Sequence, residues 1–199
     1  MSTRWMMTAR LPPEELVLDA LSGGQHEVNA LARAWLPHVY RWCARLGGPG
    51  FDSEDAAHEV LITMCRRLGG LRDAGQFPAW LFGITRRTLA NHRRRAWWRR
   101  WLPAAVIEER PAPGGPQRHV EISDAHRIVW TALSALSEAH REVLVLCELE
   151  ERSGSEAAVL LGIPLGTVKS RLRAARTRFR AELGEEEDVP SDSVVGGGR

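Results

Sequence analysis

Apolar residues recur every three or four positions along almost the whole chain. This spacing places them on one face of a helix, and no run alternates β-branched with polar residues as a half-buried strand does. The sequence therefore predicts an all-α fold. A chain of 199 residues is long enough for two small helical domains, each with its own core.

The N-terminal half predicts four helices. The first is expected over Glu14–Leu21, and the second over Glu27–Leu46, where Pro37 is expected to cause a kink. Asp52 is suited to cap the third helix, because its side chain can accept from a free backbone N–H of the first turn. Pro78 fits the first turn of the fourth.

A connector rich in proline and glycine separates this half from the rest. The segment from Pro103 to His119 holds four prolines and few large apolar residues, a composition typical of an extended, poorly ordered linker. The predicted organisation is an N-terminal extension at 1–25, a first domain at 26–101, a linker at 102–124, a second domain at 125–184, and a disordered tail at 185–199.

A helix-turn-helix is predicted within the second domain, over Ser153–Arg180. Ser153 and Glu156 have the spacing of a capping box, which opens a short helix. Gly162 is placed to end that helix, and Pro164 lies near the start of the next one. The second helix has an apolar stripe and an outward basic face, as a recognition helix in the major groove does. The alternative is a packed basic hairpin without a DNA role.

Basic residues are segregated along the chain, although the net charge is only +2 and the pI is about 8.7. The windows 74–107 and 157–181 contain no acid, and they hold seven arginines and six basic residues, respectively. Two separate basic faces are expected for a protein that binds polyphosphate chains. The alternative is two solvated helix faces.

Several classes of protein are disfavoured by what the sequence lacks. Cys43, Cys65 and Cys147 show neither a disulfide framework nor zinc-ligand spacing. No stretch approaches the about 20 apolar residues of a membrane span, and the first 20 residues lack the apolar run of a secretory signal. No metal-ligand, phosphate-loop or nucleophile motif is present. We expect a cytoplasmic protein that is not an enzyme, without cofactor, metal, small-molecule substrate or membrane insertion.

Four segments carry recognisable motifs, namely Asp52–Leu61 and Phe77–Ile84 in the first domain and Ala135–Leu144 and Leu160–Leu172 in the second. Together they resemble the extracytoplasmic-function (ECF) sigma factors, a group of the bacterial primary-sigma superfamily. Leu160–Leu172 and Ala135–Leu144 resemble the family's C-terminal DNA-binding domain. Asp52–Leu61 resembles its acidic helix, which docks on RNA polymerase, and Phe77–Ile84 resembles the segment that leads into the minus-ten helix. The segments occur in the family's order, and the likeness covers about 27–101 and 125–183.

The resemblance implies an alternative sigma factor that binds core RNA polymerase and promoter DNA, with an anti-sigma factor as a further partner. The residues implied to contact the minus-thirty-five element are Thr167, Lys169, Ser170, Arg171, Arg173 and Arg176. Those implied for the minus-ten element are Arg86, Arg87, Asn91, His92, Arg94, Arg95 and Trp97. Those implied for core polymerase are Asp52, Glu54, Asp55, His58 and Glu59.

The chain departs from the family's usual residues at six positions, namely His58, Cys65, Arg87, Asn91, Gly154 and Ala157. The small residues among them predict a less stable second domain. The tryptophans at the end of the first domain offer surfaces for unstacked bases, or they pack within the protein.

The competing function is a stand-alone helix-turn-helix regulator. Its N-terminal half would sense a ligand or form a dimer, and it would bind promoter DNA without polymerase.

Overall fold

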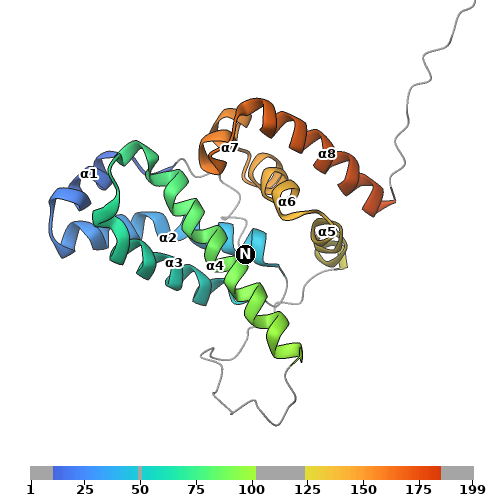
Figure 1. Cartoon of the computed structure of the whole chain (residues 1–199), viewed down its shortest axis with the longest axis horizontal. Helices are drawn as coiled ribbons and strands as arrows, with labels where there is room; N and C mark the ends of the chain where they lie inside the picture. The colour runs from blue at the N-terminus through green and yellow to red at the C-terminus, as the bar shows by residue number, and fades with distance from the viewer. Residues whose placement is uncertain (1–10, 49–50, 102–123, 185–199) are drawn as a thin grey trace, which may run out of the picture.

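The computed structural model describes residues 11–48, 51–101 and 124–184, without the side chains at 96–101 and 124–126. Its first four helices form an N-terminal unit (Figure 1). Their bounds are α1 Glu15–Ser22, α2 Gln25–Gly47, α3 Ser53–Arg67 and α4 Phe77–Trp101. Two short 3-10 turns, η1 Leu68–Gly70 and η2 Ala74–Gln76, connect α3 to α4. α1 packs on α2, so it belongs to this unit although it lies in the predicted N-terminal extension.

Aromatic side chains fill the core of the N-terminal unit. Trp42 of α2 meets Phe82 of α4 edge to face, with ring centroids 5.0 Å apart. Trp35, two turns earlier on α2, packs edge-on against Phe77, with ring centroids 5.2 Å apart. All four side chains are buried. Edge-to-face pairs of this kind add specific geometry to apolar burial, and they fix α4 across α2.

The C-terminal unit contains α5 Asp124–Ser134, α6 Glu138–Leu144, α7 Gly154–Leu161 and α8 Leu165–Leu183. A five-residue π-helical turn, η4 Val145–Leu149, extends α6. The capping box at α7 is present, because Ser153 Oγ accepts from the N–H of Glu156 and the Glu156 carboxylate accepts from the N–H of Ser153. Gly162 ends α7 at φ +64°, a left-handed conformation that favours glycine.

The structure confirms the all-α fold, and every element of the described residues is helical. Asp52 caps α3 as predicted, and Ser137 caps α6. The helix α5 ends at Ser134, and the π-helical turn after α6 was not predicted from the sequence. The linker and the tail lie outside the described residues.

Small residues at the start of the helix-turn-helix have a structural reason. A Cβ atom at Gly154 would lie 3.2 Å from Cδ1 of Leu165, tighter than ordinary contact. An aromatic side chain there would therefore require the Leu165 side chain to move. Ala157 is fully buried, so a larger residue at that position would also need the two helices to move apart.

The two units lie against each other. α7 packs on α4 (Figure 1), and η4 packs on α2. The buried apolar side chains of both units form one contiguous cluster. This arrangement brings residues more than one hundred positions apart in the sequence into contact, for example Arg45 and Glu150.

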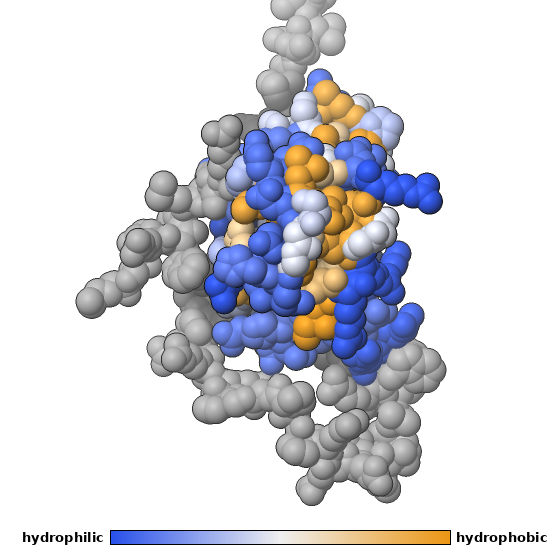
Figure 2. Space-filling view, turned by 90° about the vertical axis from the view of Figure 1, so that its left-hand side faces the viewer, coloured by the Kyte–Doolittle hydropathy of each residue, from blue (hydrophilic) through white to orange (hydrophobic). Residues whose placement is uncertain are grey.

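The surface on the side of α1 carries an apolar strip between hydrophilic flanks (Figure 2). Leu18 and Leu21 of α1 are among the large apolar side chains exposed on the molecule. Within the described ranges, no helix has the length and apolar content needed to cross a membrane.

Candidate nucleic-acid interface

The helix α8 separates an apolar face from a polar one. Val168 and Ala175 are buried, and Leu172 and Phe179 are partly buried against the other helices of the unit. Three polar residues of the first half of α8, Lys169, Ser170 and Arg173, share a shallow surface hollow with Gly166. All three are exposed. The structure thus places three of the predicted minus-thirty-five residues together on one open face.

The other predicted minus-thirty-five residues lie around this face. Thr167 and Arg171 are partly exposed. Arg176 is turned toward the preceding helices, where its Nε and Nη2 donate to Glu148 Oε1 at 2.9 and 2.5 Å. Both partners are about half exposed. Arg176 also lines an apolar groove with Val129, Phe179 and Leu183, so it stands at the border of the polar face.

The acidic start of α3 is open to solvent. Asp52 accepts a hydrogen bond from the N–H of Asp55 at 2.9 Å, while Glu54, Asp55 and His58 are exposed. Carboxylates in a first turn are favoured by the helix dipole, so their presence has a local structural cause. Their exposure also leaves them available to a basic partner surface.

Glu59 faces a different direction from the other acids of α3. It accepts a hydrogen bond from Nε2 of His92 on α4 at 2.8 Å, and Arg95 Nη1 lies 3.9 Å away. The structure therefore joins a residue predicted to bind polymerase to two residues predicted to bind the minus-ten element. The ring of Phe51 packs edge-on against the imidazole of His92, with ring centroids 5.5 Å apart.

The arginines of α4 divide into two sets. Arg87, Arg94 and Arg95 are exposed, and Nη2 of Arg94 donates to Oδ1 of Asn91 at 3.1 Å. Arg86 instead reaches the C-terminal unit, where its Nε donates to Glu142 at 2.5 Å. Trp97 lies outside the residues whose side chains the structure describes. The predicted minus-ten residues are therefore on one helix, but they do not share one free face.

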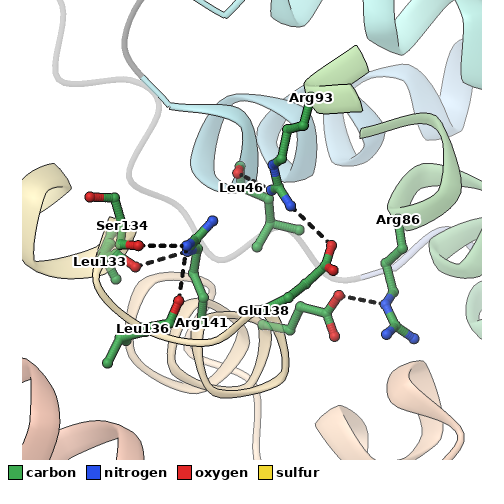
Figure 3. A network of polar contacts seen from close by, with 9 residues as sticks. Leu46, Arg86, Arg93, Leu133, Ser134, Leu136, Glu138 and Arg141 are labelled. Atoms are coloured by element: carbon green, nitrogen blue, oxygen red, sulfur yellow. Dashed lines mark hydrogen bonds and ion pairs between the residues drawn. The ribbon is translucent and has the colours of Figure 1, made fainter. Parts of the chain in front are cut away.

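Arg93 joins three elements (Figure 3). Its Nη2 donates to the carbonyl oxygen of Leu46 at the end of α2, at 2.7 Å. Its Nη1 donates to Glu138 of α6 at 2.9 Å. Nearby, Arg141 donates to the carbonyl oxygens of residues 133, 134 and 136, where α5 turns into α6. These contacts fix the first turn of α6 against the end of α2 and the middle of α4.

The acids that pair with arginines across the two units were not predicted from the sequence. Glu142 and Glu150 are buried, with 3% and 4% of their surfaces exposed. Burial raises the pKa of Glu142 above its ordinary value, and Arg86 acts in the opposite direction. A single glutamate within an amphipathic helix gives no sign of a partner on another domain. Only the packing of the two units identifies these residues as part of an interface.

In the described parts of the chain, no three His, Cys, Asp or Glu side chains lie together in a way that could hold a metal ion. The three cysteines are free thiols. Burial raises the pKa of Cys43 to about 12, which keeps its thiol protonated and unreactive at neutral pH.

Comparison with known proteins matches two segments to family models. Residues 31–99 match Sigma-70 region 2, and residues 126–179 match Sigma-70, region 4. The first segment lies within the N-terminal unit, from α2 to α4, and the second spans the C-terminal unit from α5 to α8. The two units seen in the structure therefore correspond to two regions of one class of transcription factor.

Individual relatives agree with this class. The chain is 33% identical to the RNA polymerase sigma-E factor of Streptomyces avermitilis, over 78% of this chain and 84% of that protein. It is 29% identical to the ECF RNA polymerase sigma factor SigD of Mycobacterium tuberculosis, over 85% and 83%. The fold is similar to that of the sigma factor RpoE in complex with the anti-sigma factor NepR from Bartonella quintana, with a TM-score of 0.56 and 23% identity over 78% of this chain and 96% of that one.

The chain belongs to the ECF RNA polymerase sigma factors. It therefore functions with RNA polymerase in promoter-directed initiation of transcription, as the sequence predicted. The competing prediction, a regulator without a role at polymerase, does not account for the match of the N-terminal unit to region 2.

Proposed function

We propose that α8 reads the minus-thirty-five element of the promoter through the face formed by Lys169, Ser170 and Arg173. The observation that carries this proposal is that these three side chains are exposed together at the N-terminal half of α8. A recognition helix uses that half in the major groove, where Lys and Arg reach guanine and Ser reaches bases or phosphate. Thr167, Arg171 and Arg176 border this face and complete the predicted contact set.

The N-terminal unit has two proposed roles. The exposed acids Asp52, Glu54 and Asp55, with His58, form the surface that docks on core polymerase. The exposed arginines of α4, Arg87, Arg94 and Arg95, contact the minus-ten element. This division is supported by their separation on two helices, one with an open acidic face and one with an open basic face.

Further properties follow from these roles. The proposed contacts are binding contacts, so we infer that the protein performs no catalysis and needs no cofactor. A partner of RNA polymerase acts in the cytoplasm, which is where we place it. An anti-sigma protein is proposed as a further partner, on the ground that the similar RpoE structure is a complex with an anti-sigma factor.

The proposal is tested by transcription with purified components. Core polymerase, the chain and a genomic library of promoter fragments are combined, and the start sites are mapped. We expect defined start sites, each preceded by two conserved upstream elements. These start sites should disappear when Lys169, Ser170 and Arg173 are all changed to Ala. The matched control changes Arg180 to Ala, on the groove side of α8. Start sites that persist in the triple variant would assign the upstream element to another surface.

A further inference from the structure

The C-terminal unit has an open apolar groove beside the second half of α8. α8 packs on α5 and α6 (Figure 1), and the groove lies where these helices and η4 meet. Its apolar lining consists of Val129, Leu133, Leu144, Leu149, Phe179 and Leu183. Leu133 and Leu144 are buried, whereas Val129 and Leu149 are 38% and 40% exposed. The helices of this unit therefore leave part of an apolar surface uncovered.

The rim of the groove carries an excess of positive charge. Arg176 and Arg180 of α8 line it together with a single acid, Glu148. Arg176 Nη2 lies 2.5 Å from Glu148 Oε1, so these two charges offset each other and that of Arg180 remains. An occupant that matches this groove combines carboxylates with apolar side chains.

The chain itself supplies a segment of this composition directly after α8. Its first four residues are acidic and its later ones include three valines: Glu185, Glu186, Glu187, Asp188, Val189, Val194 and Val195. We call residues 185–195 the acidic segment; it lies outside the described residues. A segment with so few apolar residues cannot form a core of its own. Another surface of the protein has to supply any apolar contact that its valines make.

The acidic segment begins at the groove. Leu183, the last residue of α8, lines the groove, and Gly184 follows it in a left-handed conformation at φ +75°. A glycine in this conformation ends a helix and turns the chain out of the helix axis. From Arg176 to Leu183 the helix rises by only about 10 Å, whereas each extended residue spans up to about 3.6 Å. The acids after Gly184 can therefore reach Arg180, and the valines can reach α5.

The covalent tether favours this occupant over a separate molecule. A segment joined to the groove by a short flexible connection has an effective concentration in the millimolar range, so weak contacts are sufficient. A second copy of the chain is a poorer match, because a symmetric dimer brings the same patch of both copies together. Two positive rims would then face each other, and like charges across an interface disfavour association.

We propose that the acidic segment is an intramolecular ligand of this groove, with its carboxylates at Arg180 and its valines over Val129 and Leu149. The docked segment covers the apolar surface that the helices leave open. Lys169, Ser170 and Arg173 line the separate shallow hollow of α8 and not the groove. Docking therefore leaves the proposed recognition face free, and the inference does not depend on the proposed DNA contacts.

Carbodiimide coupling in the full chain tests the docking, because this zero-length reagent joins a carboxylate only to an amine that it contacts. The chain has a single lysine, Lys169, so an added lysine gives a product that peptide mass spectrometry can assign. Val129→Lys places an amine in the groove, on α5. The matched control is Ala181→Lys. Ala181 is exposed and lines the shallow hollow of α8, but it is nearer to the acidic segment along the chain.

The order of the two coupling yields decides the result. A docked segment should couple several-fold more in Val129→Lys than in Ala181→Lys. A free segment should show the reverse order, because Ala181 is close to Glu185 in the sequence. The reverse order, or equal yields, overturns the docking. Coupled products at twice the mass of the chain would assign the groove to a second copy and also overturn it.

A second variant covers the case in which the first one does not fold. Circular dichroism checks that each variant keeps its helix content. If Val129→Lys loses it, Leu149→Lys takes its place, because Leu149 also lines the groove and is similarly exposed. The same order of yields relative to Ala181→Lys is then expected, and the same results overturn the docking.

The role of Arg180 is tested in the same assay. Arg180→Gln added to Val129→Lys should lower the coupling yield several-fold, because the carboxylates lose their partner at the rim. The same change added to Ala181→Lys should not lower the yield, because that lysine lies outside the groove. An unchanged yield in the groove variant, or an equal decrease in both variants, overturns the contact between the acidic segment and Arg180.

Discussion

Glu59 of α3 accepts a hydrogen bond from Nε2 of His92 on α4 at 2.8 Å. The sequence predicted that Glu59 would face polymerase and that His92 would face the minus-ten element. One side-chain hydrogen bond therefore links the two proposed surfaces of the N-terminal unit, on α3 and on α4.

This link predicts that Glu59→Ala weakens minus-ten binding, although Glu59 does not lie on the open face of α4. Without Glu59, the imidazole of His92 loses the hydrogen bond that positions it, so we expect a decrease in affinity of roughly 1 kcal/mol. Fluorescence anisotropy of holoenzyme with a minus-ten single-stranded oligonucleotide measures it. Glu54→Ala, an exposed acid of the same helix, serves as the control and should show no decrease in this assay.

Local sequence patterns predicted the helices and their caps, because these depend on neighbours a few positions away. Ser153 with Glu156, and Gly162, form the structures that their spacing predicted. The recognition face of α8 follows from helical periodicity in the same way. The sequence could not show that Arg86 meets Glu142, because that contact joins residues 56 positions apart and depends on how two units pack. Nor does periodicity distinguish Glu59, which faces α4, from the open acids beside it.

Charge reversal at Asp55 should lower the affinity for core polymerase. Asp55 is exposed in the first turn of α3 and makes no contact with α4 that would confuse the result. We expect Asp55→Lys to weaken binding by roughly 1 kcal/mol, as is typical of a charge at the rim of an interface. Binding to immobilised core polymerase measures it. Glu15→Lys on α1 is the matched control, and equal losses in both variants would indicate a general charge effect.

On the basic face of α8, substitution of a base contact and of a phosphate contact should affect DNA binding differently. Arg173→Ala or Arg171→Ala should cost about 1–3 kcal/mol on the promoter where the side chain reads a base, with relaxed sequence preference at that position. Uniform weakening on all DNA would mark a phosphate contact. Binding to a set of single-base promoter variants at fixed salt separates these results. Arg180→Ala, on the groove side of the helix, should change neither affinity nor preference.

The capping box of α7 should contribute measurably to the stability of the C-terminal unit. Hydrogen bonds from the hydroxyl and the backbone N–H of Ser153 lower the pKa of Glu156, so the carboxylate remains charged and bonded at neutral pH. Ser153→Ala removes the hydroxyl from this arrangement and should cost about 1 kcal/mol. Urea denaturation followed by circular dichroism measures the loss. Ser155→Ala, two positions later and exposed, should leave the midpoint nearly unchanged.

His38 should make the stability of the protein depend on pH. Its side chain is buried beside Trp35, and its Nδ1 accepts from Arg41 Nη2 at 3.1 Å. Burial, together with the positive charges of Arg41 and Arg152, lowers the pKa of His38 from 6.5 to about 4. Between these values the unfolded chain takes up a proton on His38 that the folded chain does not. The stability that depends on a neutral His38 is therefore complete above pH 6.5. It is lost as the pH falls toward 4, by at most about 1.4 kcal/mol per pH unit.

Urea midpoints measured from pH 7 to pH 4.5 test this pH dependence. The comparison is with His38→Asn, which keeps an acceptor for Arg41 but does not titrate. The unchanged chain should lose stability more steeply than the variant, and parallel curves would assign the pH dependence to other groups.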